Sequence, residues 1–215
     1  VNIAHPMTNP DHKRKPTGID KRPTEDAVTV RAPGPMRGGL GSGLIGDLVS
    51  EQKYHGGDDQ AVYAYAREDL DHWERELGRD IGNGVFGENL TTSGVDVTGL
   101  LIGERLAVGE DGLVLEVTSP RTPCQTFVEW LGIRGWMKTF TAAGDPGAYF
   151  RVIKPGTIRA GDRIDVLSRP DHDVTIGTVF RAMMGESDLM PALAVADALP
   201  DKIKALVAKR GQGVS

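Results

Sequence analysis

The sequence predicts a β-rich α+β fold, in which a β domain over residues 1–168 is followed by a small three-helix domain over residues 171–215. Three observations predict it. The 215 residues include 28 glycines, which favours many tight turns between short strands. Apolar and polar residues alternate in several stretches before residue 168, as they do in half-buried strands. After Pro170 the apolar residues recur at helical spacing instead.

The first third of the chain predicts loops, one strand and one helix. Residues 27–31 alternate and predict a short strand, whereas the glycines and prolines of residues 32–47 predict loops. Residues 68–77 carry apolar side chains three and four positions apart, which predicts an amphipathic helix that ends at Gly78. The start of this helix is left open, as early as Asp59.

The middle of the chain predicts most of the sheet. Residues 86–118 predict a β-meander, because alternating residues flank glycines at turn positions. Residues 126–143 predict a second short helix that two glycines interrupt. Residues 149–153 predict a strand, and residues 154–167 predict a turn followed by a further strand.

The C-terminal segment predicts three short helices, at residues 174–185, 188–199 and 201–210. Asp188 and Asp201 stand where residues that cap helix N-termini are expected. The segment therefore predicts a helical appendage to the β-rich part.

Composition excludes several classes of protein. The net charge of −5 argues against a general nucleic-acid binder, although it leaves room for a local basic pocket. No apolar stretch approaches the ~20 residues that a membrane helix needs, and no export leader is recognisable, so we expect a cytoplasmic protein that does not bind membranes. The single cysteine, Cys124, cannot form an internal disulfide.

Cys124 is the residue whose surroundings point most clearly to chemistry. Pro120 and Pro123 fix the backbone just before it, so the thiol is expected on a stiff loop after a buried strand. Arg121 lies close in sequence and favours the thiolate form, which is a ligand for soft metal ions. The alternative, that Cys124 packs as a small apolar side chain, stays open.

Three further segments suggest binding, each beside a plainer interpretation. His55 precedes two glycines that let backbone approach a ligand, but it also fits an exposed helix entry. Asn89 and Thr91 follow a tight turn and suit an anion or a heterocycle edge, or simply a turn. Lys21 and Arg22 suit a phosphate, or a solvated basic patch.

Motifs for the common nucleotide-binding, zinc-protease and hydrolase sites are absent from the sequence. Eight short segments instead follow one another in a distinctive order: TGIDKRP (17–23), IGD (45–47), HGG (55–57), AVYAY (61–65), FGENLTT (86–92), IGERL (102–106), PRTPC (120–124) and YFRVIKPG (149–156). Their order resembles the MOSC domain family, named for the C-terminal domain of molybdenum-cofactor sulfurases, and within it a bacterial subgroup with a C-terminal three-helix domain.

The resemblance implies a β-barrel-like domain that binds the molybdenum cofactor, a pterin dithiolene with a phosphate. It implies that Cys124 is the sulfur ligand of molybdenum. It also implies reduction of N-hydroxylated compounds, such as hydroxylaminopurine bases and amidoximes, in a detoxifying role. Electrons would come from a separate flavin or iron–sulfur reductase, since this chain lacks the cysteines for a cluster. An overexpressed sample is expected to lose the cofactor easily.

The resemblance also suggests roles for the other candidates. His55 is the expected proton donor or a cofactor contact. The residues expected to bind the cofactor are Lys21 and Arg22 at the phosphate, Asn89 and Thr91 at the pterin edge, Arg121 and Thr122 on the cysteine loop, and Tyr149 and Arg151 on the strand that closes the pocket.

Other functions stay open at this point. The chain could carry sulfur or the cofactor to another enzyme through a Cys124 persulfide or thiolate. It could also be a non-enzymatic binder of small molecules, and pyridoxal phosphate is a lesser alternative as cofactor.

Overall fold

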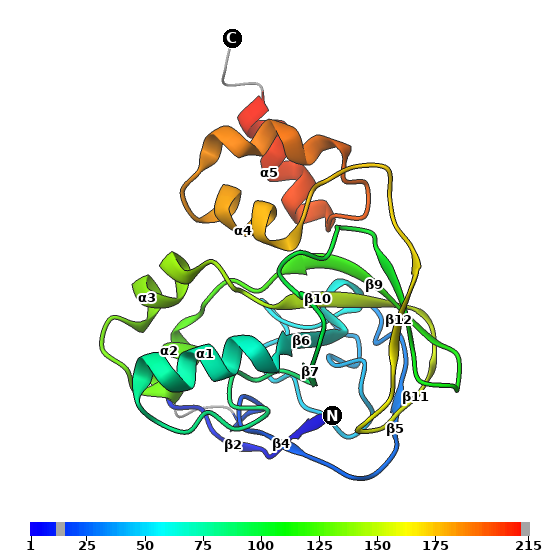
Figure 1. The fold of residues 1–215 in the computed structure, drawn as a ribbon, viewed down its shortest axis with the longest axis vertical. Coiled ribbons are helices and arrows are strands. Elements are labelled where there is room, and N and C mark those ends of the chain that lie inside the picture. The colour runs from blue at the N-terminus through cyan, green and yellow to red at the C-terminus, as the bar shows by residue number, and fades with distance from the viewer. Residues whose placement is uncertain (12–15, 212–215) are drawn as a thin grey trace.

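The computed structural model describes residues 1–11 and 16–211, and it has the predicted β-rich α+β architecture (Figure 1). A mixed six-stranded sheet forms its centre, in the order β12-β8-β9-β10-β6-β7. These strands are β6 (Val62–Ala66), β7 (Leu90–Thr92), β8 (Arg105–Val108), β9 (Leu113–Pro120), β10 (Ala148–Lys154) and β12 (Ile164–Ser168). Every pairing in this sheet is antiparallel except that of β6 with β7.

Short strands from the N-terminal part form three two-stranded sheets beside the central one. β1 (Asn2–Ala4) pairs with β4 (Lys21–Pro23), and β2 (Met7–Thr8) pairs with β3 (Pro16–Thr17). β5 (Val28–Val30), which confirms the strand predicted at residues 27–31, pairs with β11 (Gly156–Ile158) near the other end of the chain. Val28 and Val30 of β5 and Ile158 of β11 belong to the same hydrophobic cluster as residues of the central sheet.

The helix α1 (Arg67–Leu77) confirms the predicted amphipathic helix, and it ends at Gly78 with a φ of 61°. It does not extend back toward Asp59. Only a 3₁₀ turn, η1 (Asp58–Gln60), forms there, and β6 follows it. All five residues of β6 are buried, because this strand lies between β10 and β7. A strand buried on both faces shows no alternation that would reveal it in the sequence.

The helical pattern at residues 126–143 forms two helices, α2 (Gln125–Leu131) and α3 (Trp136–Ala143). Gly132 and Gly135 adopt left-handed backbone conformations between them, which is where the sequence predicted an interruption. These helices and α1 surround an aromatic cluster that includes Trp73, Phe127 and Trp136. The cluster supports the elements that carry the cysteine loop.

The C-terminal segment contains the three predicted helices, α4 (Ile176–Met184), η2 (Ser187–Val195) and α5 (Asp201–Gly211). The middle one is a 3₁₀ helix rather than an α-helix and contains Pro191, which cannot donate the backbone hydrogen bond that an α-helix interior needs. Thr175 caps α4 by accepting a hydrogen bond from the Thr178 backbone.

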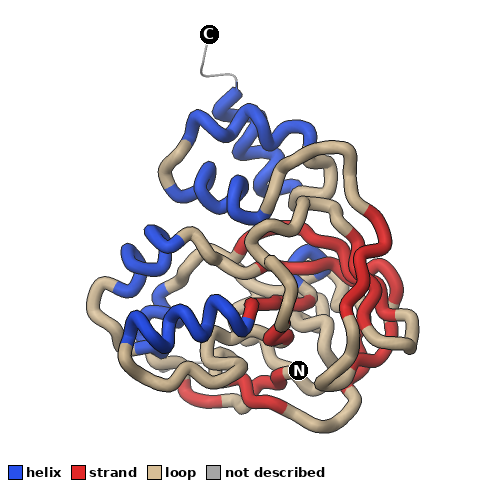
Figure 2. Tube along the Cα trace, viewed as in Figure 1, coloured by secondary structure: helices blue, strands red, loops and turns tan. Residues whose placement is uncertain are grey.

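Figure 2 shows the longer helices in two groups, the C-terminal group at the top and α1, α2 and α3 on the left, with the strands toward the right and below. One hydrophobic cluster contains residues of the sheet and of the C-terminal helices, such as Leu115, Val179 and Leu193. The division into domains over residues 1–168 and 171–215 stays a prediction. Within the described residues, no helix is both long and apolar enough to cross a membrane.

Candidate functional site

A cavity of about 570 Å³ opens between the N-terminal loops, the loop of residues 42–60 and the loop that follows β9. Its volume falls within the range of small-molecule sites. The predicted residues that line it are Lys21, His55, Asn89, Arg121, Thr122, Cys124 and Tyr149. Segments that are far apart in sequence therefore meet at one hollow.

Cys124 lies on the stiff loop that the prolines predicted. β9 ends at Pro120, and Cys124 has an extended backbone at the residue that precedes α2. Its thiol is half-buried in the cavity. Burial alone would raise the pKa of this thiol, but a hydrogen bond with His55, the charge of Arg121 and the backbone N–H of Phe127 outweigh it and lower the pKa to about 7. A large fraction of Cys124 is therefore thiolate at neutral pH.

His55 reaches the thiol from a loop that only glycine allows to fold so tightly. Gly56 and Gly57 have φ values of 81° and 80°. A side chain on Gly56 would meet the Gly41 carbonyl oxygen at 2.6 Å, so the loop lies directly against its neighbour. The Gly57 N–H donates to the same carbonyl at 3.0 Å, and the His55 N–H donates to the Glu51 carbonyl at 3.1 Å. Backbone hydrogen bonds thus hold the loop at His55 and at Gly57.

Arg121 is a buried cation beside Cys124. Its guanidinium lies 3.9 Å from the centre of the Phe127 ring and 5.2 Å from the centre of the Tyr63 ring. It also donates a hydrogen bond to the Phe86 carbonyl. Because arginine keeps its charge when buried, the side chain supplies a fixed positive potential at the thiol.

A second buried cation, Lys21, belongs to a polar network centred on Asp47. The Lys21 ammonium pairs with Asp47, and their side chains are 7% and 1% exposed. The Asp47 carboxylate also accepts hydrogen bonds from Ser42 at 2.7 Å and from Asn89 at 2.9 Å. Burial opposes ionisation of Asp47, but Lys21 and these donors outweigh it and lower the pKa of Asp47. The network fixes one wall of the cavity and neutralises much of the Lys21 charge.

The sequence model of the MOSC domain matches residues 51–165, more than half of the chain. This chain belongs to the MOSC domain family. The match includes the loop of His55, the turn of Asn89 and the loop of Cys124, so the family region supplies just over half of the residues that line the cavity.

Relatives extend the similarity of this MOSC protein beyond the matched region. It is 32% identical over 177 residues to the uncharacterized protein YflK of Bacillus subtilis (strain 168), and the alignment covers 82% of this chain and 75% of YflK. It is 30% identical over 162 residues to a reductase of Gibberella moniliformis, and the alignment covers 74% of this chain but 28% of that longer protein. The crystal structure of YiiM from Geobacillus stearothermophilus matches with a TM-score of 0.76 and 25% identity, over 98% of this chain and 96% of the other.

Asn89 lines the cavity of the MOSC domain, but most of its side chain is already engaged. Its amide oxygen accepts from the Tyr63 backbone at 3.2 Å while its amide nitrogen donates to Asp47. Tyr149 and Thr122 line the cavity without such commitments, and burial raises the pKa of the Tyr149 hydroxyl. The tyrosine ring lies 5.1 Å from the ring of Tyr63.

Arg22 and Thr91, which we expected to bind the cofactor, do not line the cavity. Arg22 is exposed and pairs with Asp20 at 2.8 Å. Successive side chains on a strand point to opposite faces, so Lys21 and Arg22 on β4 cannot share one pocket. The Thr91 hydroxyl binds Glu88 at 2.8 Å and Asn2 at 2.9 Å, away from the cavity.

Arg151 also lies outside the cavity that we expected it to close. Its guanidinium is bound by two carboxylates, Asp59 on η1 and Glu116 on β9, the second at 2.7 Å. It donates in addition to the Ala198 carbonyl, at 3.4 Å. Arg151 therefore ties three segments together behind the cavity instead of facing a ligand.

Sequence reasoning assigned no role to two residues that line the cavity, Asp47 and Lys202. Asp47 lies in the IGD segment, so a buried acid could have been sought there. Glu88 is buried in the FGENLTT turn, where it accepts hydrogen bonds from the Gly84 and Phe86 backbone. Lys202 lines the cavity from α5, and no signal in the sequence points to it.

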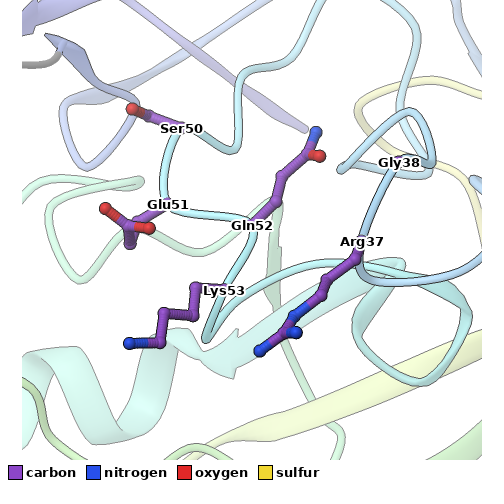
Figure 3. Close-up of a pocket in the computed structure, with 6 residues that line it drawn as sticks. All are labelled: Arg37, Gly38, Ser50, Glu51, Gln52 and Lys53. Carbon is purple, nitrogen blue, oxygen red and sulfur yellow. The ribbon is translucent and has the colours of Figure 1, made fainter.

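A second hollow of about 540 Å³ lies next to the Cys124 cavity and shares Ser50 and Glu51 with it. Figure 3 shows Ser50, Glu51, Gln52 and Lys53 on one loop and Arg37 and Gly38 on another. None of these six residues carries a thiol or an imidazole. The Cys124 cavity is therefore the candidate functional site of this MOSC protein.

Proposed function

We propose that this chain is a reductase of N-hydroxylated compounds that works with a bound molybdenum cofactor. One observation carries the proposal: a thiol with a pKa of about 7 lies in a cavity of ligand size beside two buried cations. A thiolate on a rigid loop is a suitable soft ligand for a metal, and few purely structural cysteines are so acidic.

The side chains of the cavity fit this cofactor. Cys124 offers a sulfur donor for molybdenum. Arg121 and Lys21 offer positive charge for the cofactor phosphate, although Lys21 shares its charge with Asp47. The second N–H of the Asn89 amide suits one polar atom of a pterin edge. Pyridoxal phosphate, the lesser alternative named above, is not part of this proposal.

The overall reaction converts an N–OH group, two electrons and two protons into an N–H group and water. The cofactor, when bound, supplies the two-electron abstraction of the oxygen. An external flavin or iron–sulfur reductase supplies the electrons. His55 lies at the Cys124 sulfur, where it can hold the proton that the departing oxygen needs. The aromatic rings of Tyr63, which is buried, and Tyr149, which is half-buried, would limit the access of water to this side of the cavity.

The comparisons support this proposal at a coarse level. The chain belongs to the MOSC family, and one relative is named a reductase. That name describes a protein of which this chain matches 28%, so the substrate and the electron donor are part of our proposal.

The alternative is a carrier, in which Cys124 holds a persulfide for delivery to another enzyme. An acidic thiol suits this role as well. The two functions differ in the species on sulfur, since a carrier would release sulfur on treatment with cyanide and a reductase would not.

Reduction of benzamidoxime tests the proposal. The chain is produced in a host that makes the cofactor and is supplied with an electron-donor reductase. We expect benzamidine as product, and loss of at least about 100-fold in rate for Cys124→Ser. Ser168→Ala, an exposed change on β12, is the control and keeps the rate. No reduction by the loaded native chain, together with sulfur released by cyanide, would favour the carrier instead.

A further inference from the structure

Lys202 is a cavity residue that the C-terminal helices contribute. It lies in the first turn of α5 and lines the same hollow as Cys124 and Tyr149. Its side chain is exposed, so it stands at the mouth of the cavity and not at its floor. Lys204, on the same helix, is equally exposed but does not line the cavity.

The position of Lys202 is fixed by the segment just before it. Leu199 is 2% exposed and belongs to the hydrophobic core. The Ala198 carbonyl accepts a hydrogen bond from Arg151, which also binds Asp59. Asp59 follows the His55 loop by a few residues. Arg151 therefore links the wall that carries the imidazole to the segment that carries Lys202.

The charge of Lys202 is available to a ligand. Lys21 is paired with Asp47 at the other side of the cavity, and Arg121 is buried against two rings. In the described ranges 1–11 and 16–211, Lys202 takes part in no ion pair. An ammonium group at the mouth of a cavity attracts anions over several ångströms.

Among the described residues that line the cavity, Lys202 places an exposed ammonium group at the mouth. A negatively charged group that enters the cavity is therefore favoured next to Lys202.

We propose that Lys202 binds a negatively charged group of the substrate, so that N-hydroxylated compounds bearing a carboxylate or phosphate react in preference to neutral ones. The identity of the substrate rests on the function proposed above, but the charge at the mouth does not. Lys202 is a specificity residue in this account, because it acts on the end of the substrate remote from the N–O bond.

Alkylation of Cys124 tests the charge at the mouth without any cofactor. The full chain is prepared from a host that cannot make the cofactor, and the rates with iodoacetate and iodoacetamide are compared at pH 8 and low salt. The ratio of the two rates cancels changes in thiol acidity. We expect Lys202→Gln to lower the iodoacetate-to-iodoacetamide ratio about threefold, and 1 M salt to remove the difference. Lys204→Gln is the matched control and keeps the native ratio.

A pair of substrates tests the specificity itself. We expect the loaded native enzyme to reduce 4-carboxybenzamidoxime with a kcat/KM about threefold above that for benzamidoxime, and Lys202→Gln to remove this preference. The inference would be overturned if Lys202→Gln and Lys204→Gln gave the same iodoacetate-to-iodoacetamide ratio and the same ratio of kcat/KM for the two amidoximes. If neither compound is reduced, the proposed function fails, and the alkylation ratio still decides whether Lys202 acts at the mouth.

Discussion

Replacing His55 by Asn removes the hydrogen bond that favours the Cys124 thiolate. The thiol pKa is lowered from 9.0 to about 7 in the native chain. A hydrogen bond to a charged group is worth at least about 1.5 kcal/mol, and 1.36 kcal/mol corresponds to one pKa unit. We therefore expect the pKa to move to about 8, because burial continues to oppose the charge while Arg121 and the Phe127 N–H still favour it.

The assay is the pH dependence of alkylation by iodoacetamide. Cys124 is the only cysteine among the 215 residues, so the reaction has no background from other thiols. At pH 7 the thiolate fraction falls from about one half to about one tenth, which slows alkylation about fivefold. A change in access alters the plateau at high pH, whereas a change in acidity alters the midpoint, so one curve separates the two effects.

His72→Asn is the matched control, since His72 is exposed on α1 and does not line the cavity. It should leave the midpoint at about pH 7. A native midpoint near 9, or equal midpoints for the native chain and His55→Asn, would refute the assignment of His55 as the partner of the thiol.

Three further changes test the fold by denaturant unfolding. Asp47→Asn leaves the buried Lys21 ammonium without its counter-charge and should cost about 3–5 kcal/mol; an unchanged midpoint would show that the pair is not buried in solution. Burial and nearby carboxylates, Asp145 among them, raise the pKa of Asp69 to about 6. Because this folded-state pKa lies above the unfolded one, ionisation of the Asp69 carboxyl destabilises the fold as the pH rises from about 4 through 6. Asp69→Asn should therefore stabilise the protein by about 1 kcal/mol at pH 8 but not at pH 3. An equal gain in stability at both pH values would contradict this. Gly57→Ala should cost at least about 2 kcal/mol, because Gly57 has a φ of 80° and a Cβ there would lie 2.6 Å from facing backbone; a neutral result would mean that the loop has another conformation.

Patterns that act over a few residues predicted much of the fold. The alternation of β5 and of the antiparallel pair β8–β9, the spacing of α1 and the glycines between α2 and α3 all depend on neighbours in sequence. The meander predicted over residues 86–118 is wrong beyond that pair, because β7 pairs in parallel with β6 at the other edge of the sheet. β6 was missed because a central strand is apolar on both faces and has no period to detect. The 3₁₀ geometry of η2 follows from Pro191, whose effect the apolar pattern alone does not reveal.

The difference between local patterns and long-range contacts also explains which features of the site could be predicted. The stiff loop of Cys124 follows from Pro120 and Pro123, which act locally. Lys202 reaches the cavity only through the packing of the C-terminal helices, and Asp59 and Glu116 bind Arg151 only once β9, β10 and η1 have assembled. Such contacts between distant segments leave no local signal.

The most direct test of the account is the molybdenum and pterin content of the chain purified from a host that makes the cofactor. The account predicts about one molybdenum and one pterin per native chain, and a loss of at least about tenfold in molybdenum for Cys124→Ala, because the sulfur ligand is gone. Ser168→Ala should match the native chain. Equal molybdenum in the native chain and in Cys124→Ala would contradict the central claim that Cys124 holds the metal.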